Sequence, residues 1–351
     1  MDKSSSSLLV KKVQEAYAFC IFSEPGKLSS ELYIQDNLQQ EIPKEGFCFS
    51  PFVEDLDSPA IYISSERKRK LEDVDFNWLA KVNLPLLDKA INDTSFAAYE
   101  SAFDKFSNEL NSDSELEKLV LSRVKDLPWN GNPFLLFRKL KNRYPENFVY
   151  LLFHPVAGVW LAASPETLVN VRSNIVKTMA LAGTQLPNSK GVVTWGEKEI
   201  DEHNFVVDYI AETLNNAGCD EVQVSKAETV RAGKVYHLMT PIIGALGKEL
   251  NWLNLSQELH PTPAVCGTPK GIAREFILNN EGHKRSYYCG YVGPYSENEV
   301  NLFVNLRCMS LFENKVSLFL GGGITRASVL MDEWNETENK ALTLLDCLKE
   351  N

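Results

Sequence analysis

The chain has 351 residues, of which 44% are hydrophobic, so it is long enough to bury a large core in one domain or two. Its formal net charge of −11 argues against a nucleic-acid partner, which would require clustered lysine and arginine. The seven cysteines are scattered and form no Cys-x-x-Cys pair, which predicts reduced thiols in a cytoplasmic protein rather than disulfides or a zinc site.

Neither the N-terminal residues nor the longest apolar run has the pattern of a membrane segment, so no membrane partner is predicted. Residues 1–9 are polar and rich in serine, which does not fit a secretory signal peptide. The longest apolar stretch, 148–163, is shorter than a membrane span and carries His154-Pro155 in its middle. We therefore interpret this stretch as two strands joined by a turn.

The first third of the chain mixes helical and extended patterns. Charged residues 64–76 are expected to form a linker or a long surface loop. Apolar residues at helical spacing predict a helix over 95–111, and a second amphipathic helix over 133–143. The remaining predicted elements in this part are a helix at 8–18 and strands at 18–22, 47–49 and 61–63.

From residue 148 onward, strands and helices alternate irregularly, with turn residues between them. Strands are expected at 148–153, 159–163, 166–171, 176–182, 221–224, 236–246, 288–294, 302–311 and 316–320. Helices are expected at 196–216, around 256, at 271–279 and at 328–348. This mixture of hairpins and helices predicts an α+β fold with a largely antiparallel sheet system.

Two helices carry the same spacing of acidic residues. Glu199, Glu202 and His203 stand at i, i+3 and i+4 and so share one helix face, and Glu333 and Glu336 repeat the Glu-x-x-Glu spacing near the C-terminus. Two such faces on separate helices could hold a cation between them. The alternative is that acidic residues in a first helical turn favour the helix dipole and face water.

Lys118 and Glu166 are candidates for acid–base chemistry. Lys118 stands before a β-branched apolar run, where it is either a surface lysine or, if its amine is removed from water in a cleft, a general base. Glu166 follows Ser164-Pro165 in a predicted turn between strands. It is either a solvated turn residue or a partly buried carboxyl that could act as a general acid.

Glycines and one arginine could bind an anion. Gly183-Thr184 and Gly321-Gly322-Gly323 end two predicted strands, where backbone N–H groups could approach an anion closely or simply form tight turns. Neither segment matches a dinucleotide or P-loop pattern. Arg307 is predicted within a strand, where it either faces solvent at an edge or binds a substrate carboxylate with its planar fork.

Taken in order, eight short motifs resemble those of the chorismate-utilising enzymes. These motifs are Glu117-Lys118-Leu119-Val120-Leu121-Ser122-Arg123, Ser164-Pro165-Glu166, Leu181-Ala182-Gly183-Thr184, Lys198-Glu199-Ile200-Asp201-Glu202-His203, Leu259-His260-Pro261-Thr262-Pro263-Ala264, Gly290-Tyr291-Val292-Gly293, Leu306-Arg307 and Glu333-Trp334-Asn335-Glu336-Thr337-Glu338-Asn339-Lys340. The resemblance implies a chorismate-binding fold with antiparallel sheets, flanking helices and an active site in a central cleft. It also implies one enzyme domain over 1–351, with the catalytic core at 95–351 and a weakly matching part at 1–94.

Within that family, two positions point to the isochorismate synthase branch. Members that add ammonia usually carry Gln where this chain has Lys118, and aminodeoxychorismate synthases typically carry a nucleophilic Lys where this chain has Ala182. Salicylate synthases share the lysine and are the alternative. Thr184 departs from the branch, which often has Ser there, and no segment resembles a glutaminase, so no glutaminase subunit is expected.

The resemblance also implies roles for the candidate residues. Glu202 and Glu336 would bind Mg²⁺ directly, and Glu199 and Glu333 would hold its waters. Lys118 would activate a water for attack at C2 of chorismate while Glu166 protonates the leaving C4 hydroxyl. The residues that would contact the substrate are Gly183, Thr184, Tyr288, Arg307, Gly321, Gly323 and Lys340.

Two other classes compete with this interpretation. A scaffold protein that keeps the fold without its chemistry is disfavoured because every implied acid, base and metal position is filled. A carboxylate-bridged di-iron protein would need Glu-x-x-His on two helices of a bundle, whereas this chain has adjacent Glu202-His203 in a strand-rich context.

Overall fold

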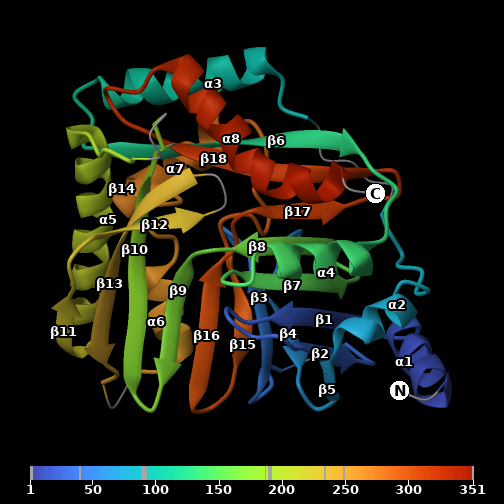
Figure 1. Cartoon of the computed structure of the whole chain (residues 1–351). Coiled ribbons are helices and arrows are strands. Elements are labelled where there is room, and N and C mark those ends of the chain that lie inside the picture. The colour runs from blue at the N-terminus through green and yellow to red at the C-terminus, as the bar shows by residue number, and fades with distance from the viewer. Residues whose placement is uncertain are drawn as a thin grey trace.

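The computed structural model describes residues 3–38, 41–87, 93–185, 187–188, 192–232, 235–247 and 250–349. Within these residues, helices surround two large antiparallel sheets, and Figure 1 shows the strands of one sheet running across the view and those of the other running up it. The helices are α1 (Lys3–Gln14), α2 (Phe76–Leu79) after a short 3₁₀ turn (Asp73–Asp75), α3 (Phe96–Leu110), α4 (Pro133–Arg143), α5 (Glu197–Asn216), α6 (Trp252–Leu259), α7 (Lys270–Asn280) and α8 (Leu330–Lys349).

Both sheets are built almost entirely from hairpins and neighbouring antiparallel strands. In spatial order, the first sheet contains β14 (Gly267–Thr268), β6 (Lys118–Pro128), β18 (Lys315–Ile324), β17 (Cys308–Leu311), β8 (Gly158–Ser164), β7 (Phe148–His154), β1 (Ala18–Ser23), β2 (Ser30–Gln35) and β5 (Lys68–Leu71). The second contains β11 (Asp220–Val224), β13 (Val235–Ala245), β10 (Ile175–Gln185), β9 (Thr167–Arg172), β16 (Glu299–Val304), β15 (Tyr291–Tyr295), β3 (Gly46–Ser50) and β4 (Ile61–Ser64), with β12 (Glu228–Ala232) paired to β13. The α+β prediction is confirmed.

The sequence of β1 explains its central place in the first sheet. Residues 18–22 are apolar without alternation, and the whole strand is buried. Cys20 and Phe22 pack into one hydrophobic cluster, whereas Phe19 and Ile21 pack into another on the opposite face. A strand covered on both faces needs a continuous apolar run, because successive side chains point to opposite sides.

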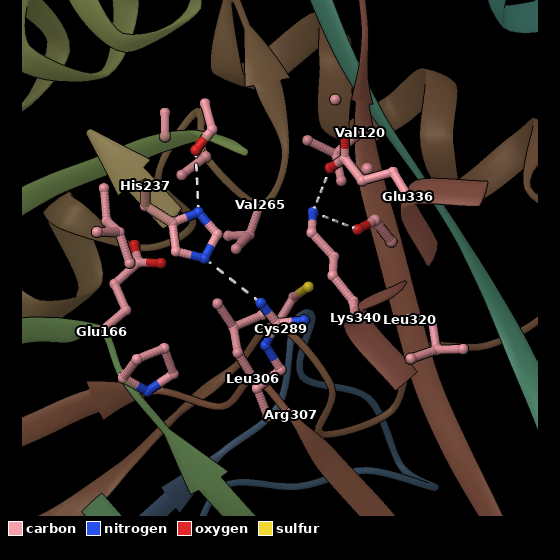
Figure 2. Close-up of a pocket in the computed structure, with 18 of the residues that line it drawn as sticks. Val120, Glu166, His237, Val265, Cys289, Leu306, Arg307, Leu320, Glu336 and Lys340 are labelled. Carbon is pink, nitrogen blue, oxygen red and sulfur yellow. Dashed lines mark hydrogen bonds and ion pairs between the residues drawn. The ribbon is translucent and has the colours of Figure 1, made fainter. Parts of the chain in front are cut away.

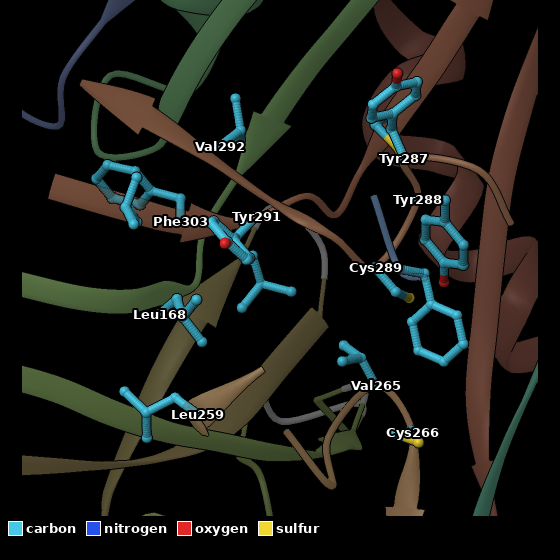
Figure 3. Packing of buried hydrophobic residues seen from close by; sticks show 14 of the residues in the cluster. Leu168, Leu259, Val265, Cys266, Tyr287, Tyr288, Cys289, Tyr291, Val292 and Phe303 are labelled. Carbon is cyan, nitrogen blue, oxygen red and sulfur yellow. The ribbon is translucent and has the colours of Figure 1, made fainter. Parts of the chain in front are cut away.

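The larger cluster fills the space between the two sheets. Figure 3 shows Leu168, Val265, Tyr291 and Phe303 within it, contributed by segments far apart in the chain. The stacked rings of Phe148 and Phe303, 4.3 Å apart between centroids, join a strand of the first sheet to one of the second. This core holds the strand ends that carry the candidate site.

Local capping explains several helix starts. Ser95 accepts a hydrogen bond from the N–H of Ala98 at 3.2 Å, and α3 begins at the next residue. Asn132 accepts from two N–H groups at the start of α4, whose first residue is Pro133. None of the helices in the described part of the chain combines the length and apolarity that crossing a bilayer requires.

Two sequence predictions about elements were wrong. Residues 64–76 are not a loop, because 68–71 form β5, a basic strand at the sheet edge whose Leu71 is buried. Charged residues suit such an edge, since they discourage pairing with other chains. The single strand expected over 302–311 is two strands in different sheets, β16 and β17, and Arg307 lies between them rather than inside a strand.

Candidate active site

A pocket opens where the two sheets and helices α5 and α8 meet. Figure 2 shows the Glu166 carboxylate on one side of this pocket and the side chains of Lys340 and Glu336 on the other. Of the residues predicted from the sequence, those that line the pocket are Glu166, Gly183, Glu202, Tyr288, Arg307, Gly321, Gly323, Glu336 and Lys340. Ala182, the position that pointed to one branch of the family, also lines it.

The other predicted residues lie around the pocket. Lys118 and Glu333 are fully buried behind its wall. Glu199 accepts a hydrogen bond at 2.9 Å from the N–H of Gly196, so its carboxylate turns back to the start of its own helix. Thr184 belongs to β10, but its side chain lies outside the described part of the structure.

Lys118 and Glu202 meet in an ion pair at the inner end of the pocket. The Lys118 Nζ atom lies 2.9 Å from Glu202 Oε1, and the lysine side chain has no solvent exposure. Glu202 reaches this point from the first turns of α5, while Lys118 begins β6. The pocket-lining carboxylate of Glu202 therefore connects Lys118 to the cavity.

Three consecutive glycines of β18 have no side chains, so side chains from other elements can approach the backbone of this strand on both faces. A Cβ atom on Gly323 would lie 2.5 Å from Glu202 Oε1 and 3.0 Å from Lys118 Cε. A Cβ atom on Gly322, on the opposite face, would lie 3.4 Å from Glu333 Oε2 and 3.5 Å from Glu336 Oε1. Any larger residue at position 323 would thus displace the Glu202 carboxylate.

Glu166 is a buried acid in the turn between β8 and β9. Only 3% of its surface is exposed, and its backbone carbonyl accepts from the N–H of Val304 at 2.9 Å. Burial raises the pKa of its carboxyl from 4.5 to about 8, against the opposing charges of Lys118, Lys340 and Arg307. At neutral pH the carboxyl is protonated, as a general acid must be.

His237 is a pocket residue that sequence reasoning missed. Its Nδ1 atom lies 2.9 Å from the Gly183 carbonyl oxygen, and its Nε2 atom lies 3.5 Å from Nη2 of Arg307. Burial, with the charges of Arg307 and Lys340, lowers its pKa to about 3, so the ring is neutral, donates through Nδ1 and accepts from Arg307. A polar residue inside the apolar run 235–245 was the available signal.

Arg307 occupies the crossing between the two sheets. Its φ angle of 48° lies in the left-handed region, which turns the chain from β16 into β17 and lets the buried guanidinium enter the pocket. A regular strand would instead have alternated its side chains across one sheet. This local turn explains why a charged residue in an apolar segment ends inside the protein.

Three of the four predicted metal-site glutamates approach the β18 glycines, Glu202 at the Gly323 position and Glu333 and Glu336 at the Gly322 position. Glu336 Oε1 is 2.6 Å from Lys340 Nζ, and Glu202 is paired with Lys118. Among the described residues, no three acidic, histidine or cysteine side chains are gathered tightly enough to enclose a metal ion as they stand. The donor chemistry nevertheless fits a hard cation, because Glu202 and Glu336 both line the pocket and offer carboxylate oxygens.

Comparison with known proteins agrees with the motifs. Residues 65–346 match the family model described as chorismate binding enzyme. The chain is 31% identical over 248 residues to isochorismate synthase EntC of Escherichia coli K12, covering 68% of this chain and 63% of that protein. It is 34% identical over 250 residues to isochorismate synthase MenF of the same strain, covering 68% of this chain and 57% of that protein.

The chain therefore matches about three fifths of the length of these curated relatives. A solved structure described as a putative 2,3-dihydroxybenzoate-specific isochorismate synthase, DhbC from Bacillus anthracis, superimposes with a TM-score of 0.79 at 24% identity. That superposition covers 99% of this chain and 100% of the other. At this identity the likeness establishes a common fold.

Proposed function

The chain belongs to the family of chorismate binding enzymes, and from this premise we propose that it is an isochorismate synthase, an isomerase that converts chorismate to isochorismate. The observation that carries the proposal is the chemistry of one pocket. A buried carboxyl that keeps its proton at neutral pH, Glu166, shares the pocket with Glu202, which contacts the buried amine of Lys118. An acid in the cavity wall, and an amine behind that wall in contact with the pocket-lining Glu202, suit the exchange of one hydroxyl group for another.

The proposed reaction adds water at C2 and removes the C4 hydroxyl. In this proposal Lys118 acts as the neutral amine and accepts a proton from the attacking water. Glu166 donates its proton to the departing hydroxyl, which leaves as water while the ring double bonds shift between the two positions. The product is an isomer of the substrate. Solvent then returns a proton to Glu166 and removes one from Lys118, so the enzyme ends each cycle as it began.

Cationic and N–H groups around the pocket suit a substrate with two carboxylates. The Arg307 guanidinium is buried in the pocket wall, with His237 accepting from one of its nitrogens. Lys340 stands across the cavity and donates to the Gly321 carbonyl at 2.9 Å. We propose that these two cations, with N–H groups of Gly321 and Gly323, bind the carboxylates, and that Tyr288, Gly183 and Thr184 line the ring.

We propose that Mg²⁺ is the cofactor, bound by Glu202 and Glu336, with Glu199 and Glu333 contacting its waters. When bound, this ion would screen the ring carboxylate of the substrate and fix the position of the ring. The carboxylates of Glu202 and Glu336, which line one pocket, support this assignment. In the arrangement described here, the side chains of Lys118 and Lys340 contact those of Glu202 and Glu336.

We also propose that the chain acts as one catalytic unit in the cytoplasm, without a glutaminase subunit. The single-unit proposal is supported by the N-terminal strands, because β1 pairs with β7 and β3 pairs with β15. All seven cysteines are free and buried, which supports a reducing compartment.

The product assay decides between the candidate activities. Purified protein is incubated with chorismate and Mg²⁺, with and without an ammonium salt, and the products are resolved by chromatography. Isochorismate as the end product is expected in both conditions. Salicylate with pyruvate would favour the salicylate synthase alternative, and an aminated product or the absence of isochorismate would refute the proposal.

A further inference from the structure

Arg123 connects α8 to β6, the second strand in the order of the first sheet. It lies five residues after Lys118 on the same strand, and the pairing of β6 with β18 runs from Leu119 to Pro128 without a shift in register. Because side chains alternate along a strand, Lys118 and Arg123 point to opposite faces. Arg123 is 2% exposed, so its charge needs partners inside the protein.

Three residues of α8 supply those partners. The Nε atom of Arg123 donates to Thr337 Oγ1 at 2.7 Å, and its Nη2 atom pairs with the Glu338 carboxylate. Its guanidinium lies over the Trp334 ring, 3.9 Å from the centroid. Trp334, Thr337 and Glu338 stand at i, i+3 and i+4, so they form a single face of the helix.

This face adjoins the one that carries the site residues. Glu333, Glu336 and Lys340 have the spacing i, i+3 and i+7, and Thr337, which accepts from Arg123, stands four residues after Glu333 and three before Lys340. Glu333 and Glu336 approach the Gly322 position of β18, which is paired with Leu121 of β6. A change in how α8 lies on β6 would therefore move the site carboxylates relative to the glycine strand.

Neighbouring groups make the contact specific. Lys125, two residues further along the same face of β6, donates to the second oxygen of Glu338 at 2.5 Å. Phe96 and Tyr99 of α3 meet the Trp334 ring edge to face, with centroids 5.1 and 5.2 Å away. Stacking on the Trp334 ring thus opposes rotation of α8. The two charge-assisted hydrogen bonds to Glu338 oppose movement of the helix along its axis.

We propose that Arg123 is a positioning residue, which sets the place of α8 on β6 and thereby holds Glu336 and Lys340 at the pocket. The inference rests on the proposed function for the meaning of the site, but the contacts of Arg123 are independent of it. Groups that orient metal ligands typically change metal affinity or activity 10- to 100-fold when removed. A purely structural arginine would change thermal stability without changing affinity at the pocket.

The test compares variants by calorimetric titration with MgCl₂, and separately with chorismate, alongside thermal unfolding. We expect Arg123→Met to weaken Mg²⁺ binding about tenfold or more and to raise the Mg²⁺ concentration needed for half-maximal turnover, with kcat at saturating Mg²⁺ changed less. Arg123→Lys should recover part of the affinity because it keeps the charge. Lys125→Met, which leaves Arg123 on Glu338, should have a smaller effect.

The matched control is Lys141→Met, which removes another buried cation. Lys141 lies on α4, away from the pocket, and its Nζ atom is 3.1 Å from the carboxylate of Asp73. Equal Mg²⁺ and chorismate affinities in Arg123→Met and Lys141→Met would overturn the inference, whatever their unfolding temperatures. If wild-type protein binds Mg²⁺ and chorismate but forms no isochorismate, the proposed activity fails while the affinity comparison still decides the role of Arg123.

Discussion

The side chains on the two faces of the glycine strand, β18, are brought to the same pocket in different ways. On the Gly323 face, Glu202 and Lys118 pack so closely that a Cβ atom would lie 2.5 Å from the carboxylate. On the Gly322 face, the nearest carboxylate atom would be 3.4 Å away, an ordinary contact distance. The α5 side of the site is therefore placed by the absence of a side chain, whereas the α8 side is placed by anchoring residues such as Arg123.

Removing the lysine of the close-packed face should have the largest effect on catalysis. We expect Lys118→Ala to lower kcat by roughly 10²- to 10⁴-fold, the range found for a general base, while chorismate still binds. Single-turnover kinetics and calorimetric binding measure the two quantities separately. The control is Lys284→Ala, which removes an exposed ammonium paired with Asp55 and Asp57. Near-normal turnover by the Lys118 variant would show that another group is the base.

A methyl group added to each glycine tests the comparison directly. Gly323→Ala should displace Glu202 and reduce kcat/KM by about tenfold or more, since a misplaced site carboxylate behaves like a removed supporting group. Gly322→Ala adds the same atom one residue away, where it meets only ordinary contacts, and should change kcat/KM by less than about threefold. Similar losses in the two variants would contradict the difference between the faces.

Many residues of the candidate site could be predicted because each is recognisable from its own local sequence. Lys118 precedes a β-branched apolar run, Glu166 lies in a turn between strands and Glu202 belongs to a Glu-x-x-Glu helix face, and the ordered family motifs identify them. The helix expected at 133–143 matches α4, because Asn132 and Pro133 define its start. Local rules thus succeed where one residue type determines the backbone.

Long-range geometry is what the sequence could not supply. The turn at Arg307 depends on a left-handed residue between strands of two sheets, and 302–311 was therefore predicted as one strand. The contact of His237 with Arg307 joins positions 70 residues apart. Glu199 has the spacing of a metal-site residue, but its carboxylate accepts from Gly196 at its own helix start, an interaction that helix periodicity alone does not reveal.

The two candidate metal-site glutamates of α5, Glu199 and Glu202, provide a comparison within one helix. Glu202 lines the pocket, so we expect Glu202→Gln to weaken Mg²⁺ binding about tenfold or more and to lower turnover at a fixed Mg²⁺ concentration. Glu199→Gln should have a smaller effect, because an amide oxygen can still accept from the Gly196 N–H. Calorimetry with MgCl₂ on both variants makes the comparison. A larger loss in the Glu199 variant would reverse the assignment of the two residues.

The smallest expected effect concerns Glu166, whose pKa is influenced from both sides of the glycine strand. Burial raises this pKa to about 8, and the charges of Lys118 and Lys340 act in the opposite direction. Between its unfolded value of about 4.5 and about 8, the folded state binds a proton that the unfolded state has lost. This group therefore stabilises the fold fully below pH 4.5, and its contribution declines as the pH rises through about 8.

Glu166→Gln removes the titrating group, so the free energy of unfolding of the wild type should fall more steeply with pH than that of the variant. One proton accounts for a slope difference of no more than about 1.4 kcal/mol per pH unit. Urea denaturation from pH 5 to 8.5 measures both curves, and groups common to the two proteins cancel in the difference. Parallel curves would mean that Glu166 ionises normally in the folded protein. It could not then remain the proton donor at neutral pH, and the acid would have to be sought elsewhere in the pocket.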